Sequence, residues 1–160
     1  MQRVMIICVG KMKEKFYIEA AAEYVKRLSR HCKLEILELP EQRLPESPAP
    51  AEIERALAKE AEAIRAKLPP SPTLVAMCIE GQMRSSEEMA KLLADWGNQG
   101  EKCVVFLIGG SNGLHPSLKA EARARLSMSP MTFPHHLARV MLLEQIYRGY
   151  QILEGSKYHK

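Results

Sequence analysis

The carboxyl-terminal third of the chain decides the fold: it reads FLIGGSNGLH over residues 106–115, LSMSPMTFPHHLARVMLLEQIYRGY over residues 126–150 and GSKYHK over residues 155–160. An apolar strand runs into a glycine-rich turn, a second short strand runs into a proline-bounded turn, and a long helix follows. Loops at the carboxyl ends of neighbouring parallel strands meet at one edge of a sheet. The stretch therefore predicts a small-molecule pocket in an α/β protein.

The rest of the chain alternates strand-like apolar runs with helical periods. Continuous apolar runs over residues 4–9, 74–79 and 103–108 predict strands buried on both faces, with the last and most hydrophobic at the centre. The alternation over residues 33–39 predicts a half-exposed strand near an edge. We also expect a short strand over 126–128 and helices over 14–29, 51–68, 116–124 and 134–153, with another that begins at the Ser85 cap and is ended by Gly97 and Gly100. This order predicts a doubly wound parallel sheet of about five strands in one domain, residues 1–160.

Several helices carry an apolar face that predicts where they pack. The first helix places Phe16, Ala20, Tyr24 and Leu28 at i, i+4 spacing on one side. Trp96 is expected in the core. The last helix is apolar over a wide arc, which predicts burial by the sheet on one side and by a partner subunit on the other, with a fully buried core helix as the alternative. The residues of this arc are Leu137, Val140, Met141, Leu143, Ile146, Tyr147 and Tyr150.

Composition indicates a cytoplasmic protein with no membrane span. The early apolar run over residues 4–9 is too short for a signal core or a transmembrane helix. The four cysteines are widely spaced, with no CxxC, and three lie in strand-like runs, so we expect reduced, buried thiols. Residues 101–160 carry eight basic and four acidic side chains, an excess that suits a polyanionic partner but also an ordinary solubility charge.

The glycine loop matches no nucleotide fingerprint. Gly109, Gly110 and Gly113 form GGxxG, whereas the dinucleotide motif requires a glycine at the position of Ile108 and lies near a first strand. No Gly-Lys-Ser/Thr sequence follows, so the loop lacks the lysine and hydroxyl of a P-loop. Ser111 has no suggested acid–histidine pair, which makes a hydrolase a poor alternative. A tight turn that needs positive φ is the plain explanation.

The adjacent histidines at 135 and 136 do not predict a metal site. Neighbouring residues on a helix point about 100° apart, and no further ligand spacing supports an ion. His135 and Arg139 share a helix face, as do Glu144 and Arg148. Either these residues form ordinary ion pairs on a solvated face, or they present positive charge beside the pocket for a phosphate or a base.

The motifs LIGGSNGLH, MTFPHHLARVMLLEQIYRGYQI and the final YHK resemble those of the RlmH-type (YbeA-like) SPOUT methyltransferases. VGKMKEKF after the first strand, EYVKRL in the first helix and IEGQMRSSE after the third strand fit the same family. The resemblance covers essentially the whole chain. It implies an α/β fold with a carboxyl-terminal trefoil knot, which general topology rules would have excluded.

The resemblance also implies a reaction. RlmH-type enzymes transfer the methyl group of S-adenosylmethionine to N3 of a pseudouridine in large-subunit (23S) ribosomal RNA, act on assembled ribosomes and work as homodimers without a metal. Carried over by position, the cofactor site consists of Met77 (where the family usually has leucine), Gly109, Met128, Ser129, Pro130, Met131, Thr132 and Phe133.

The same carry-over implies catalytic candidates at His135, Arg139, Arg148, Tyr158 and His159, with the tail of one subunit, including Lys160, reaching the pocket of the other. Positive charge would stabilise the anion that develops when N3 loses its proton. Arg139 and the tail are expected to position the RNA. Either histidine is a candidate to take the proton, and the choice stays open. The alternative is a non-catalytic module that binds ribosomal RNA through the basic half.

Overall fold

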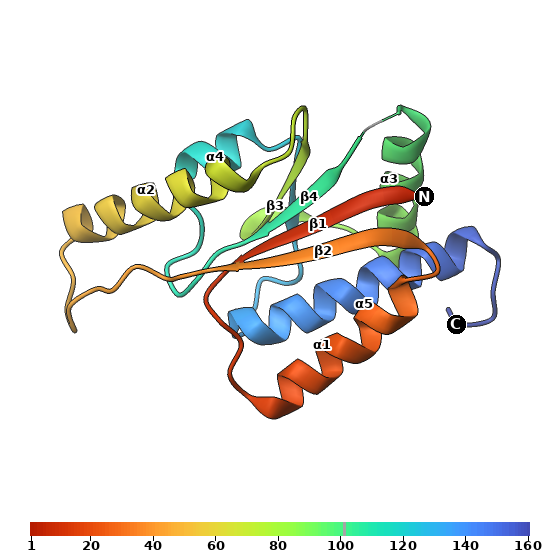
Figure 1. The fold of residues 1–160 in the computed structure, drawn as a ribbon, viewed down its shortest axis with the longest axis horizontal. Helices are drawn as coiled ribbons and strands as arrows, with labels where there is room; N and C mark the ends of the chain where they lie inside the picture. The colour runs from red at the N-terminus through yellow and green to blue at the C-terminus, as the bar shows by residue number, and fades with distance from the viewer. Residues whose placement is uncertain (101) are drawn as a thin grey trace.

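The computed structural model describes residues 1–100 and 102–160. Within these residues, five strands and five helices alternate (Figure 1). The strands are β1 (Gln2–Val9), β2 (Cys32–Leu39), β3 (Thr73–Met83), β4 (Val104–Ile108) and β5 (Ala124–Ser127). The helices are α1 (Lys15–Leu28), α2 (Pro50–Lys67), α3 (Ser86–Asn98), α4 (Pro116–Glu121) and α5 (His135–Leu153).

All the strand pairs are parallel, in the order β2-β1-β4-β3-β5, so the predicted five-stranded parallel sheet is confirmed. As expected, β2 lies at an edge and β4 at the centre, where every one of its residues is buried. The carboxyl ends of all five parallel strands lie at the same edge of the sheet, and β3 lies between β4 and β5. Ligands of doubly wound sheets bind at this edge.

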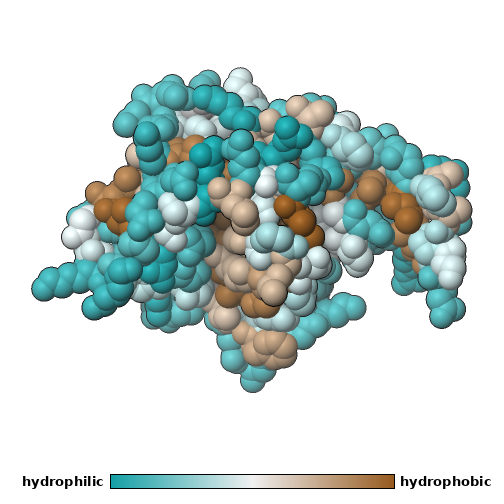
Figure 2. Space-filling view, turned by 180° about the vertical axis from the view of Figure 1, so that it is seen from behind, coloured by the Kyte–Doolittle hydropathy of each residue, from teal (hydrophilic) through white to brown (hydrophobic). Residues whose placement is uncertain are grey.

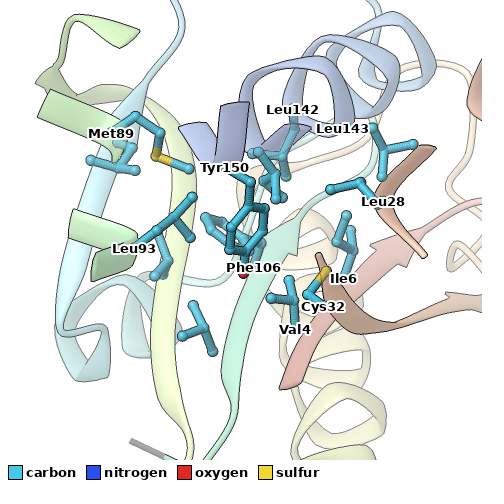
Figure 3. Packing of buried hydrophobic residues seen from close by; sticks show 14 of the residues in the cluster. Val4, Ile6, Leu28, Cys32, Met89, Leu93, Phe106, Leu142, Leu143 and Tyr150 are labelled. Carbon is cyan, nitrogen blue, oxygen red and sulfur yellow. The ribbon is translucent and has the colours of Figure 1, made fainter. Parts of the chain in front are cut away.

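Helices cover both faces of the sheet (Figure 1). On one face α1, α3 and α5 pack on the sheet through a cluster that includes Leu28, Leu93, Phe106 and Leu143 (Figure 3). On the other face Ala61 of α2 and Leu118 of α4 pack on alternate residues of the same strands. The predicted core position of Trp96 is confirmed, since only 3% of this residue is exposed. The four cysteines are free, and Cys78 is only half-buried, contrary to expectation.

The end of β3 differs from the sequence prediction. The strand continues through Gly81 to Met83, four residues beyond the expected end, because its last residues pair with β5 after a register shift. A Cβ at Gly81 would lie 2.8 Å from the backbone of Arg125 and Leu126. Glycine at this position therefore allows β5 to approach β3 closely. The strand predicted over residues 126–128 is β5, which begins two residues earlier than predicted.

The predicted packing of α1 is wrong at its first turn. Leu28 is fully buried and Tyr24 packs against the core, but Phe16 is 64% exposed. The beginning of α1 projects below the sheet, past the start of α5 (Figure 1). Periodicity predicted the face of the helix correctly, but it does not indicate how far along the helix the neighbouring surface extends.

Candidate active site

A hollow of about 730 Å³ opens at the carboxyl ends of β3, β4 and β5, and its size is typical of a small-molecule site. Three segments line it: the end of β3, the glycine loop after β4, and the loop that joins β5 to α5. Of the predicted cofactor residues, all but Pro130 line the hollow. Lining residues that we did not predict include Ile79, Glu80, Leu114, Lys119 and Ala138.

The glycine loop is a tight turn whose glycines are required by close backbone contacts. A Cβ at Gly109 would lie 2.3 Å from the backbone of Gly113. Gly113 has a φ of 76° and donates its N–H to the carbonyl of Gly110 at 3.0 Å. The plain explanation, a turn that needs positive φ, is thus confirmed at Gly113, while the turn also forms one wall of the hollow.

The loop after β5 is held by its own serines. The Ser127 hydroxyl donates to the Ser129 carbonyl at 3.1 Å, and the Ser129 hydroxyl accepts the N–H of Met131 at 3.0 Å. Pro134 then precedes the first residue of α5. This loop exposes Met131 to solvent, 73% accessible, while Met128 and Phe133 stay half-buried. Backbone groups and apolar side chains therefore make up this wall.

Glu41, in the loop between β2 and α2, packs against the glycine loop and stabilises it. Its carboxylate accepts the N–H of Ser111 at 2.7 Å, and a Cβ at Gly110 would lie 2.6 Å from the same oxygen. The neighbouring residue Gln42 donates its N–H to Glu60 of α2 at 2.8 Å, which ties the loop to the helix. Sequence reasoning missed Glu41 because it lies 70 residues from Ser111 in a proline-rich loop that has no apolar period.

His135 lies at the mouth of the hollow. Its ring packs on Gly10, where an added Cβ would lie 3.2 Å from Nε2. Burial lowers the pKa of His135 below its ordinary value, and His136 acts in the same direction. Because the neutral imidazole is favoured, this side chain is able to accept a proton near neutral pH.

Arg139 does not line the hollow. Its side chain is 5% exposed, and the guanidinium donates to Glu38 at 2.6 Å and to the carbonyl of Gly10 at 3.1 Å. Burial opposes ionisation of Glu38, but hydrogen bonds from Met12 and Arg139 lower its pKa overall. Neither explanation offered for this face fits Arg139: it forms an ion pair, but the pair is buried and not on a solvated face, and its partner lies on β2 and not on its own helix.

The remaining catalytic candidates form a separate cluster at the other end of α5. Arg148 donates from two nitrogens to Glu144 at 3.0 Å, as the i, i+4 spacing predicted. The Tyr158 hydroxyl donates to Glu144 at 2.7 Å, and burial raises the pKa of Tyr158 to about 12. His159 contacts Arg148 at 3.1 Å and Glu87 of α3 at 2.7 Å. The tail thus folds against α3 and α5 of its own chain.

The structure therefore divides the five predicted catalytic residues between two places. His135 and Arg148 are thirteen residues apart on one helix, a separation of about 20 Å at 1.5 Å per residue. Only His135 lies at the hollow. Within one chain, the cluster of Arg148, Tyr158 and His159 does not reach it.

Comparisons with known proteins identify the family of this chain. A family model described as a predicted SPOUT methyltransferase matches residues 2–159. The chain belongs to the SPOUT methyltransferase family. The fold is similar to that of a probable methylase family protein from Haemophilus influenzae Rd KW20, with 13% identity, a TM-score of 0.55, and coverage of 99% of this chain and 71% of that one. At this level of identity, the similarity supports the fold alone.

SPOUT methyltransferases typically use S-adenosylmethionine, and the residues of the hollow fit that group. Main-chain groups of the 109–113 and 128–133 loops can satisfy the polar edges of adenine and of an amino acid, while Met77, Met128 and Phe133 offer apolar walls. The departure at Met77 from the family's usual leucine keeps an apolar side chain at the hollow. None of the helices among the described residues combines the length and the apolar composition that a membrane crossing needs.

Proposed function

We propose that this SPOUT methyltransferase methylates N3 of a pseudouridine in large-subunit ribosomal RNA, on the assembled ribosome in the cytoplasm. The observation that carries the proposal is the hollow at the ends of β3, β4 and β5, lined by the same segments that resemble RlmH-type enzymes. The basic excess of residues 101–160 suits an RNA partner. We further propose that the carboxyl-terminal part of the chain is threaded through a loop as a trefoil knot, as the resemblance to RlmH-type enzymes implies.

The chemistry requires alignment and the removal of one proton. When bound, S-adenosylmethionine would supply an activated methyl group and leave as S-adenosylhomocysteine, while the N3 proton of the target would pass to a base. The glycine loop and the loop over residues 128–133 hold the reacting groups in place. His135 is our candidate for the proton acceptor, because its imidazole lies at the hollow and its lowered pKa keeps it neutral. Its nearest competitor for this role is His159 of a second copy.

We also propose that the enzyme is a homodimer whose active site combines both subunits. A second hollow, about 370 Å³ in volume, lies between α5 and residues of α1, α3, β3 and β5, and Tyr24, Val140 and Met141 form part of its apolar wall. A second copy that covers this hollow would explain the wide apolar arc of α5. An antiparallel arrangement of the two α5 helices would bring the cluster of Arg148, Tyr158 and His159 close to the partner subunit's hollow.

Methyl transfer from labelled S-adenosylmethionine to ribosomes tests the proposal. We expect label on ribosomes that carry the pseudouridine, little on naked RNA, and none on ribosomes in which uridine replaces it. Mass spectrometry of the digested RNA should place the methyl group on N3. Calorimetry with S-adenosylmethionine separates the alternative, a non-catalytic RNA-binding module, which would bind ribosomes but not the cofactor.

A further inference from the structure

The segment between β1 and the first turn of α1, residues 11–17, presents cations and an aromatic ring together at the surface. Lys11, Lys13, Lys15 and Phe16 are exposed, and the Phe16 ring packs at 4.4 Å on the ring of Tyr17. Among the residues that the structure describes, neither Lys11 nor Lys13 makes an ion pair, and Lys15 makes only an open contact of 3.7 Å with Glu19. We call residues 11–17 the lysine–phenylalanine segment.

The lysine–phenylalanine segment is firmly anchored although its side chains are exposed. Met12 alternates inward between Lys11 and Lys13 and is only 6% exposed. Its N–H donates to Glu38 at 2.9 Å, and the same carboxylate oxygen accepts from Arg139 of α5 at 2.6 Å. Through Glu38, the buried Arg139 therefore links this segment to α5.

The lysine–phenylalanine segment also lies beside the mouth of the active-site hollow. Gly10 contacts the ring of His135, which lines the hollow. Glu14 pairs with His136 at 3.4 Å, and the Tyr17 ring lies 6.4 Å from the ring of His136. Glu14, the acid within the segment, thus points towards α5. The beginning of α1 forms the lower tip of the molecule in both views (Figures 1 and 2).

We propose that this segment docks the single-stranded RNA that flanks the target nucleotide, with an unpaired base stacked on Phe16 and phosphates held by Lys11 and Lys13. This inference rests on the proposed function, since it assigns a substrate-binding surface to that site. Exposed aromatic rings beside basic side chains suit unpaired nucleotides, because each base offers a face for stacking and each phosphate a negative charge. The Tyr17 ring packs against the Phe16 ring, so the Phe16 side chain should lose little conformational freedom when RNA binds.

A second copy of the chain is a less suitable occupant. In a two-fold contact centred on this segment, the three lysines would face their own equivalents, and like charges across an interface are unfavourable. The apolar hollow along α5 offers the better surface for self-association.

Binding of a fluorescent single-stranded oligoribonucleotide of about twelve nucleotides to the full chain tests the segment without relying on methyl transfer. We expect Phe16→Ala to weaken binding about tenfold and Phe16→Tyr to restore most of it, since loss of stacking on one base has an effect of this size. Lys13→Ala should reduce the slope of log affinity against log salt by about 0.7, as expected for one lost phosphate contact on a single strand. Calorimetry should give unchanged affinity for S-adenosylmethionine in each variant.

The matched controls are Val25→Ala, an exposed apolar residue further along α1, and Lys59→Ala, an exposed lysine on α2 across the sheet. Both should bind RNA like the unmodified chain. The inference is overturned if Phe16→Ala binds RNA normally, if it is no weaker than Val25→Ala, or if sedimentation shows that Phe16→Ala separates a dimer. Should the unmodified chain bind the oligoribonucleotide in this way but fail to methylate ribosomes, the proposed function falls while the docking surface stands.

Discussion

The two ends of α5 use charge in different ways. At the amino end, Arg139 is 4% exposed and its partners are Glu38 and the backbone of Gly10, so the charge is enclosed by the fold. At the carboxyl end, Arg148, Glu144, Tyr158 and His159 form a half-exposed network built partly from the last residues of the chain. The enclosed pair fixes the backbone of Gly10, which the His135 ring contacts, whereas the open network would be able to exchange its partners in the homodimer that we propose.

The largest effect on cofactor binding and stability is expected from a substitution in the glycine loop, the wall of the hollow near the amino end of α5. Gly109→Ala would place a Cβ 2.3 Å from the backbone of Gly113, which cannot yield as a flexible side chain does. We expect affinity for S-adenosylmethionine to fall at least about a hundredfold and stability to fall by about 3 kcal/mol. Calorimetry and urea unfolding measure the two effects.

Gly97→Ala in α3 is the matched control, because its Cβ would meet nothing closer than 3.7 Å. This change should leave cofactor binding intact and raise stability by about 0.5–1 kcal/mol. A Gly109→Ala protein that bound the cofactor as tightly as Gly97→Ala would show that the glycine loop is not a wall of the site.

The difference between the two arginines is itself testable. Arg139→Met should lower the free energy of unfolding by about 3 kcal/mol, because it leaves Glu38 and a backbone carbonyl without their buried partner. Arg148→Met should lower the free energy of unfolding by about 1 kcal/mol or less, since the ion pair of Arg148 with Glu144 is partly open to solvent. Equal losses in chemical unfolding would contradict the contrast between the two ends.

The enclosed pair of Arg139 and Glu38 should also change how stability depends on pH. The folded-state pKa of Glu38 is lowered, so its contribution is fully present above the unfolded-state pKa and is lost as pH falls through the folded-state value. The stability gap between the native chain and Glu38→Gln should therefore be constant near pH 7 and shrink below about pH 4.5. Glu19→Gln, at an exposed pair on α1, should show a small gap throughout.

The smallest effect that we expect concerns Glu41. Glu41→Ala removes the acceptor of the Ser111 N–H and should weaken cofactor binding about fivefold, the equivalent of about 1 kcal/mol. Glu41→Gln keeps an acceptor oxygen and should recover most of the affinity. Hydrogen exchange at residues 109–113 should quicken in the alanine variant alone. If the two variants behaved alike, the carboxylate charge would matter and not the hydrogen bond.

Much of the architecture follows from local patterns. Apolar runs predicted the buried strands, and the alternation over 33–39 predicted the edge strand, because burial on one or two faces leaves a direct mark on residue order. The loops at 109–113 and 128–133 were likewise predicted as walls of one pocket, and both line the hollow. The strands that they follow were expected to be neighbours, but β3 lies between β4 and β5. The exposure of Phe16 was not predicted, since helical spacing defines a face but not the extent of the neighbouring surface.

Residue order was sufficient to predict the parallel sheet, its helices, the family and the loops that meet at the hollow. The division of the charged residues between the interior and the surface became known from the three-dimensional packing. This packing enclosed Arg139 with Glu38 and set Glu41 behind the glycine loop. These outcomes depend on contacts between residues 70 to 101 positions apart, and no local spacing records such contacts.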